Sequence, residues 1–282
     1  MRIVRHLNRI AVGAAIIAGA TLGAASAAQA DGMDRGAQAA YVRPFTWTGF
    51  YVGGNVGYGW GDNNRVRDLD GYNPNGNFRI GDTDGASFGL QAGYNQQFQR
   101  IVVGIEGDGG FLGLTGAGQF PPFIGVRSPT DSAATVDMDY YGTITGRLGF
   151  TAGERLLIYG KAGWGWVRAR ASFTDSDPTG GATLVSGLER NRTLDGGVWG
   201  GGLEYALSDW FSLKVEYLHF DISDTLTHIA RSNTGSSLRF AHDIEDFDTV
   251  TGRWEVSFSS GSEAALSEAR SSPACRPSGA HR

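Results

Sequence analysis

TGFYVGGNVGYGWG, residues 48–61, places small residues and large apolar residues at alternating positions. The even positions hold Phe50, Val52, Val56, Tyr58 and Trp60, and the odd positions hold Gly53, Asn55, Gly57 and Gly59. A period of two is typical of a β-strand whose two faces meet different surroundings. The stretch therefore predicts a strand with one apolar, aromatic face and one small or polar face.

The same stretch contains a glycine-rich run, GGNVGYGWG, that superficially resembles a phosphate-binding loop. Such a loop lies between a strand and a helix, and no helical pattern follows here. The short motifs DLDGYN and DTDG could begin a calcium loop, but neither continues to the terminal Glu that such a loop needs. We therefore expect no nucleotide, no metal and no other cofactor.

The alternation recurs in seven further segments, which are residues 86–98, 101–111, 140–150, 156–167, 197–207, 210–220 and 248–258. Each is about the 9–11 residues that a tilted strand needs to cross a bilayer. The pattern predicts an all-β fold, an eight-stranded antiparallel transmembrane up-and-down β-barrel over residues 45–258.

The connections between these segments alternate strictly in length. Short turns are expected at Gln99-Arg100, at residues 151–155 and at Ser208-Asp209, whereas long polar connections cover residues 61–85, 112–139, 168–196 and 221–247. Outer-membrane barrels have short periplasmic turns and long extracellular loops. A soluble sandwich has no reason to alternate in this way.

The smaller face of the segments carries charges that we expect in the barrel lumen. They are Glu106, Asp108, Arg147, Lys161, Glu204, Lys214, Glu216, Arg253 and Glu255. An eight-stranded interior is barely wide enough for side chains, so opposite charges would have to pair there. We interpret the network as structural filling, and solute conduction remains the alternative.

Aromatic residues gather near the segment ends and predict two girdles at the membrane interfaces. The expected interface residues are Phe50, Tyr58, Trp60, Phe98, Phe150, Trp164, Trp166, Phe211, Phe220 and Phe258. A soluble lipocalin-like barrel with scattered surface aromatics is the alternative interpretation.

The N-terminal 30 residues have the pattern of a secretory signal peptide. Arg2, Arg5 and Arg9 precede an apolar run, and Ala28-Gln29-Ala30 forms a cleavage pattern. A membrane anchor is the alternative. Cleavage would leave 21 basic and 29 acidic residues, a net charge of about −8, which argues against nucleic-acid binding. Residues 31–44 would form a periplasmic lead-in.

Several segments resemble a known family in their order along the chain. FTWTGFYVGGNVGYGWG, GLQAGYNQQF, VVGIEGD, GTITGRLGF, LIYGKAGWGW, GGLEYAL and WFSLKVEYLHFD are similar to strands of the small outer-membrane immunogenic proteins of Gram-negative bacteria, which are opacity-type, porin-like barrels. The resemblance implies an outer-membrane location, surface-exposed antigenic loops and no catalytic residues.

The C-terminal end departs from that family's pattern. Members typically stop at an aromatic residue that closes the last strand, a signal for the barrel-assembly machinery, and Phe258 has the right position. Residues 259–282 continue without a period of two. We hypothesise a disordered periplasmic tail or a frame-shifted end of the gene.

One group of polar residues suggests chemistry at the outer end of the seventh segment. His219, Asp221 and Ser223 share parity, and a base beside a hydroxyl can activate a nucleophile, as in a lipid-A esterase. We expect instead a structural and surface-interaction role in the cell envelope, with antigenic loops presented at the cell surface and no enzymatic activity. A small-solute porin is the second interpretation and a lipid-A-modifying enzyme the third. The expected partners are outer-membrane lipid and lipopolysaccharide, the barrel-assembly machinery, and host or envelope surface partners.

Overall fold

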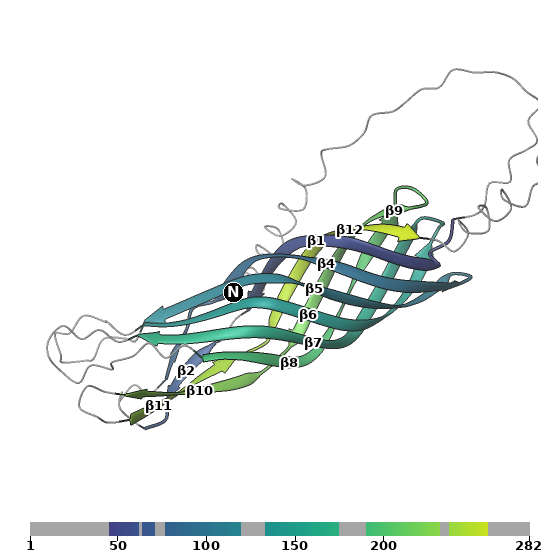
Figure 1. The fold of residues 1–282 in the computed structure, drawn as a ribbon. Coiled ribbons are helices and arrows are strands. Elements are labelled where there is room, and N and C mark those ends of the chain that lie inside the picture. Colours follow the sequence, from purple (N-terminus) through teal and green to yellow (C-terminus); the bar gives the residue numbers. More distant parts are fainter. Residues whose placement is uncertain are drawn as a thin grey trace, which may run out of the picture.

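The computed structural model describes residues 45–61, 64–70, 77–119, 133–174, 190–231 and 237–258. Eight long antiparallel strands close into a barrel (Figure 1), as the period of two predicted. They are β1 (Gly49–Gly61), β4 (Thr83–Phe98), β5 (Ile101–Gln119), β6 (Ala133–Ala152), β7 (Leu156–Thr174), β8 (Arg190–Ala206), β9 (Phe211–Asp221) and β12 (Phe247–Phe258). The expected signal peptide, lead-in and tail lie outside the described residues.

The barrel closes between its first and last strands. β1 pairs with β12, with Phe50 opposite Phe258, and on its other edge with β4. Every strand of the barrel is therefore hydrogen-bonded on both sides, which leaves no exposed edge. Within the described ranges, no helix has the length and hydropathy needed to cross a membrane.

The tight turns occur where the sequence predicted them. Gln99 and Arg100 connect β4 to β5, residues 153–155 connect β6 to β7, and residues 207–210 connect β8 to β9. Gly153 has a φ of 77°, a conformation in which a side chain would be strained, so this turn requires glycine.

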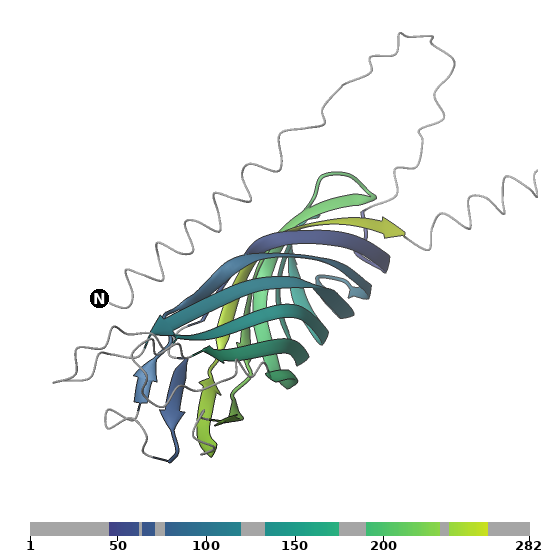
Figure 2. The same cartoon turned by 60° about the vertical axis from the view of Figure 1, so that its left-hand side comes forward.

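Two of the connections predicted as long polar loops contain strands. β2 (Arg65–Asp68), β3 (Asn77–Arg79), β10 (Asp224–Arg231) and β11 (Ser237–Ile244) form a four-stranded sheet in the order β10-β11-β2-β3. Figures 1 and 2 place this sheet at the barrel end away from the short turns. We call it the extracellular sheet, after the side on which the sequence analysis expects the long connections of the barrel. β2, β10 and β11 attach to the barrel through buried apolar residues, Val66, Leu226 and Phe240, which pack with residues of the barrel strands.

The outer wall of the barrel is apolar and exposed. Leu90 is 72% exposed and Phe50 is 66% exposed, and both lie on the even-numbered face that the sequence assigned to the membrane. Such continuous exposed apolar surface is stable only against lipid. The inward face carries the buried charges and small residues.

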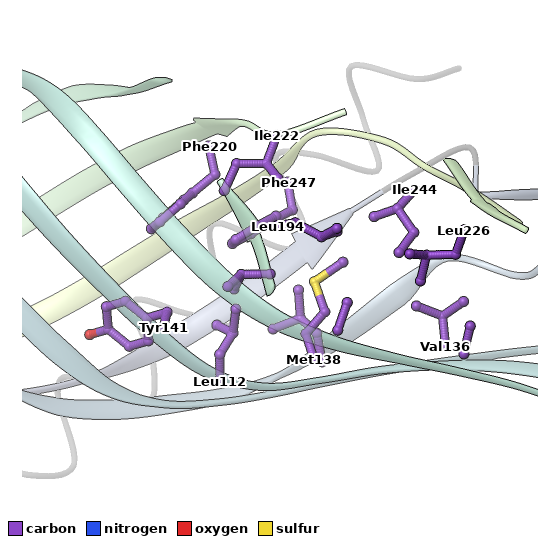
Figure 3. Close-up of a cluster of buried hydrophobic side chains, with 14 of the residues drawn as sticks. Leu112, Val136, Met138, Tyr141, Leu194, Phe220, Ile222, Leu226, Ile244 and Phe247 are labelled. Carbon is purple, nitrogen blue, oxygen red and sulfur yellow. The ribbon is translucent and has the colours of Figure 1, made fainter. Parts of the chain in front are cut away.

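The half of the interior near the extracellular sheet contains a core that the sequence did not predict. We call it the apolar cluster; it combines barrel residues such as Leu112, Met138 and Phe220 with residues of the sheet (Figure 3). Its fully buried members include Leu114, Val136, Val167, Leu194, Leu218, Ile222, Leu226, Phe240, Ile244 and Phe247. The cluster joins the sheet to the barrel.

A bulge explains part of this difference. The pairing of β6 with β7 shifts by one residue between Met138 and Tyr141, so β6 carries an extra residue there relative to β7. The pairing of β5 with β6 shifts between Phe111 and Leu114, where the extra residue lies on β5. Inward positions are odd below the bulge, at Tyr141 and Thr143, and even above it, at Met138 and Val136. Assigning the inward face of β6 from one parity along the whole strand therefore gives the wrong face beyond the bulge.

Candidate functional site

Six strands bring the nine predicted lumenal charges together inside the barrel. Glu106 and Asp108 come from β5, and the others come from β6, β7, β8, β9 and β12. All nine are buried. We call this group the charged cluster: Glu106, Asp108, Arg147, Lys161, Glu204, Lys214, Glu216, Arg253 and Glu255.

Glu106 is the hub of the charged cluster. Its carboxylate accepts hydrogen bonds from the ammonium groups of Lys161 at 2.6 Å and Lys214 at 2.7 Å, and from the guanidinium of Arg253 at 3.3 Å. The Tyr51 hydroxyl donates a fourth bond at 2.7 Å. A carboxylate held by three cations from three strands ties opposite walls of the barrel together.

A second carboxylate shares two of these cations. Glu216 accepts hydrogen bonds from Lys161 at 3.1 Å and from the Tyr159 hydroxyl at 2.7 Å, and it pairs with Arg253 at 2.6 Å. Asp108 also bonds both Lys161 and Arg253. Lys161 and Arg253 therefore each bridge three carboxylates.

The end of the cluster nearest the turns contains the remaining pairs. Arg147 donates to Glu204 and stacks over the Tyr159 ring with 4.0 Å between the guanidinium carbon and the ring centroid. The Ser212 hydroxyl donates to Glu204 at 2.6 Å. Glu255 pairs with Lys214 at 2.5 Å.

Two tyrosines complete the charged cluster and were not among the predicted site residues. Tyr51 and Tyr159 have the inward parity on β1 and β7, and both donate to carboxylates of the cluster. Their odd positions were a signal in the sequence. An inward tyrosine among buried acids supplies a donor that adds no charge.

Dense pairing of opposite charges explains why the cluster can stay buried. Five carboxylates meet four cations in a space without solvent exposure. An unpaired buried charge costs several kcal/mol, whereas multiple hydrogen bonds offset that cost. The cluster therefore fills the lumen stably only while its charged members remain paired with one another.

Apolar side chains close the lumen on both sides of the charged cluster. Near the turns, Trp47 packs with Val102, Leu157 and Tyr159, and Phe45 covers Trp47 at 5.0 Å between ring centroids. On the other side, a cavity of about 10 Å³ separates Arg253 from the apolar cluster. That volume holds about one water molecule.

Most of the predicted interface aromatics point outward. Phe50, Phe98, Phe150, Trp164, Trp166 and Phe258 are exposed, and Tyr58 and Phe211 are partly exposed. Phe220 is wrongly placed by that prediction, because it is 1% exposed and stacks on Phe247 inside the apolar cluster. Its even position on β9 matches Lys214 and Glu216, so its parity already indicated the interior.

Trp60 is the second aromatic that differs from the expectation. It has the outward parity of β1 but is only 2% exposed. Trp60 lies at the end of β1, where the chain leaves the barrel toward the extracellular sheet. It is therefore not part of an exposed girdle.

The hydrogen bonds of the described residues do not join His219 to Ser223. Nδ1 of His219 lies 2.8 Å from Asp248, and the Ser223 hydroxyl donates to Asp246 at 3.1 Å. Among the described residues, no group of three or more His, Cys, Asp or Glu side chains could hold a metal ion. The base and hydroxyl of the esterase hypothesis are therefore engaged elsewhere.

Comparison with known proteins identifies the family. Residues 14–244 match the model of the outer membrane protein beta-barrel domain. The chain belongs to this family. It is therefore an outer-membrane β-barrel protein, as the resemblance to the outer-membrane immunogenic proteins indicated.

Two relatives of this outer-membrane β-barrel illustrate the similarity. The 31 kDa outer-membrane immunogenic protein of Brucella melitensis is 32% identical over 190 residues, which cover 65% of this chain and 75% of the relative. The 22 kDa outer membrane protein of Rhizobium leguminosarum is 28% identical over 188 residues, covering 66% of this chain and 69% of the relative.

Solved structures share less with the chain. The outer membrane protein OprG from Pseudomonas aeruginosa is 13% identical with a TM-score of 0.48, covering 76% of this chain and 97% of that protein. Neisserial surface protein A is 16% identical with a TM-score of 0.36, covering 75% of this chain and 98% of that protein.

Proposed function

We propose that this outer-membrane β-barrel is a non-conducting structural protein of the cell envelope. In this role it anchors a folded extracellular sheet and its loops at the cell surface for contact with envelope or host partners. Its membrane partners are outer-membrane lipid and lipopolysaccharide, and the barrel-assembly machinery inserts it. No enzymatic step is part of the proposal.

The closed interior is the observation that supports this proposal. The charged cluster links six strands through side chains that are almost fully buried. Apolar side chains cover it toward the turns and toward the extracellular sheet. A water-filled path for ions would have to break several buried ion pairs at once, which costs more than thermal fluctuation supplies.

Planar-bilayer recording of the purified full chain tests the proposal. We expect no stable unit conductance. The alternative function, a small-solute porin, predicts discrete openings whose conductance rises with salt concentration. Such openings would contradict a structural role and support the porin.

Cysteine labelling on intact cells tests the surface role. In a Cys275→Ser background, Thr227→Cys lies on exposed β10 of the extracellular sheet, and Ser208→Cys lies in the turn between β8 and β9. A membrane-impermeant maleimide should label Thr227→Cys in intact cells and Ser208→Cys only after lysis. The reverse labelling pattern would show that the sheet faces the periplasm, and it would contradict the surface role.

A further inference from the structure

The outward face of β7 changes from aromatic to cationic along its length. Trp164, Trp166 and Arg168 are exposed and Arg170 is half-buried at successive even positions, while the odd-numbered Val167, Ala169 and Ala171 are fully buried. Neighbouring positions on one face of a strand are about 6–7 Å apart. The two arginines therefore follow directly above two tryptophans on the outer wall.

The level of these arginines relative to the membrane follows from strand length. A membrane strand crosses the hydrocarbon in about 10 residues, and aromatic residues mark its ends. β7 begins at Leu156, next to the short turn, so its crossing ends near Trp166. Arg168 and Arg170 then lie at the level of the headgroups of the outer leaflet.

Arg168 is the cation that remains available at this level. Nε of Arg170 donates to Asn191 at 3.1 Å, and its guanidinium lies 3.7 Å from Asp139. None of the described residues forms an ion pair with Arg168, whose cross-strand neighbour is the exposed hydroxyl residue Thr193. The nearby carboxylate of Asp195 is held by Trp164 at 3.1 Å.

Other sectors of the barrel present acids at the corresponding level. Outward carboxylates there accept hydrogen bonds from the aromatic girdle: Tyr58 donates to Asp84, and Tyr217 donates to Asp248 at 2.7 Å. The chain has only two lysines, Lys161 and Lys214, and both belong to the buried charged cluster. In the part of the chain that the structure describes, the outward cations of the barrel wall at the outer headgroup level are therefore the arginines of β7.

We propose that the sector around Arg168 binds the phosphate of lipopolysaccharide. Arginine matches phosphate geometry with two parallel donors, and the site lies at the boundary of a low-dielectric medium where such bonds are strong. Thr193 adds a hydroxyl donor, and Trp164 and Trp166 contact the acyl region below. The site orients the barrel against the outer leaflet. It is compatible with an open lumen and with a closed lumen.

This inference rests on the proposed function, in which lipopolysaccharide is a membrane partner, and names the site that would bind it. Its test measures lipid binding, so the result does not depend on whether the barrel conducts ions. The detergent-purified full chain is titrated with bisphosphorylated lipid A and with the same lipid A after phosphatase treatment, with binding read by native mass spectrometry. Wild type should bind the bisphosphorylated form more tightly. Arg168→Ala should weaken that binding on the order of tenfold.

Arg100→Ala is the matched control, because Arg100 is an exposed arginine in the turn at the opposite end of the barrel. It should bind as wild type does, and both variants should keep the heat-modifiable gel shift of a folded barrel. Unchanged binding by Arg168→Ala, or equal loss in both variants, would overturn the proposal. A third arm measures binding to phosphatidylglycerol vesicles. If Arg168→Ala weakened that binding as much as it weakened binding to lipid A, the site would be one for phospholipid, and its assignment to lipopolysaccharide would be overturned.

Discussion

Inside the barrel, the half near the short turns holds the charged cluster, whereas the half near the extracellular sheet holds the apolar cluster. The first resembles a buried salt-bridge network, and the second resembles the core of a soluble protein. The difference follows from what each half must join. The charged cluster joins barrel walls to one another, and the apolar cluster joins the barrel to a sheet outside the membrane.

Two kinds of interior should respond differently to substitution. Ion pairs fail when one partner is removed, because the others are left buried and uncompensated. Apolar contacts fail in proportion to the volume removed.

Glu106→Gln should give the largest loss of stability in the charged cluster. It leaves four cations, Lys161, Lys214, Arg253 and Arg147, around a neutral side chain, and we expect the free energy of unfolding to fall by about 3–5 kcal/mol. Urea unfolding followed by gel mobility measures it. Glu154→Gln in the exposed turn is the control and should change stability by less than about 0.5 kcal/mol. An equal loss of stability in Glu106→Gln and in Glu154→Gln would show that the charged cluster does not stabilise the fold.

Leu218→Ala should destabilise the apolar cluster by about 3 kcal/mol, because Leu218 is 1% exposed and its removal leaves a cavity. The matched control is Leu203→Ala, which removes a leucine from the outer wall, where lipid can fill the space. The same unfolding assay should show a smaller loss for the control. A larger loss at Leu203 would mean that the interior contributes less than the lipid contact.

Glu255→Gln should cost less than Glu106→Gln, about 1–3 kcal/mol. Glu255 pairs with Lys214 alone among the contacts described, and Lys214 keeps Glu106 as a second partner. The comparison uses two isosteric changes in one cluster. Equal losses would show that the cluster has no hub and that its charges contribute uniformly.

The extracellular sheet should show the smallest effect, a loosening at acid pH. Arg67 lowers the pKa of the Asp243 carboxyl through a hydrogen bond, and Arg239 lowers the pKa of Asp70 in the same way. A lowered pKa stabilises the fold above the usual carboxyl range near 4, and that stabilisation is lost as the pH falls through the lowered value. The barrel strands should not follow this change.

Hydrogen exchange of β2 and β11 amides, corrected for intrinsic rates, measures this loosening between about pH 5 and pH 3. In Arg67→Gln the pH dependence attributable to Asp243 should flatten, while the Arg239 pair stays intact as an internal control. An unchanged pH profile in Arg67→Gln would remove the ion pair as its cause.

The barrel could be predicted from the sequence because each membrane strand must be apolar on one face. That requirement produces the period of two in all eight segments. The period also predicted which charges face the interior, such as Glu106 and Arg253. The partners Tyr51 and Tyr159 had the correct parity as well. Which charge pairs with which depends on register across strands, which a single segment does not reveal.

The extracellular half could not be predicted in the same way. β2 and β3 are too short to show a period, and β2 is held by Val66, which packs in the apolar cluster. The bulge on β6 shifts the parity at Met138, so an unbroken alternation misassigns the faces above it. Trp47 closes the turn end from outside any strand, where no periodicity exists.

The most direct test of a closed interior uses the two lysines of the chain. Lys161 and Lys214 both lie in the charged cluster, so small amine reagents report on access to the lumen without substitution. The folded full chain is treated with formaldehyde and borohydride, and intact mass is recorded before and after unfolding.

The closed interior predicts methylation of the N-terminal amine alone in the folded barrel, with both lysines modified only after unfolding. Rapid modification of Lys161 and Lys214 in the folded barrel would show that water and small solutes reach the charged cluster, and would contradict the account.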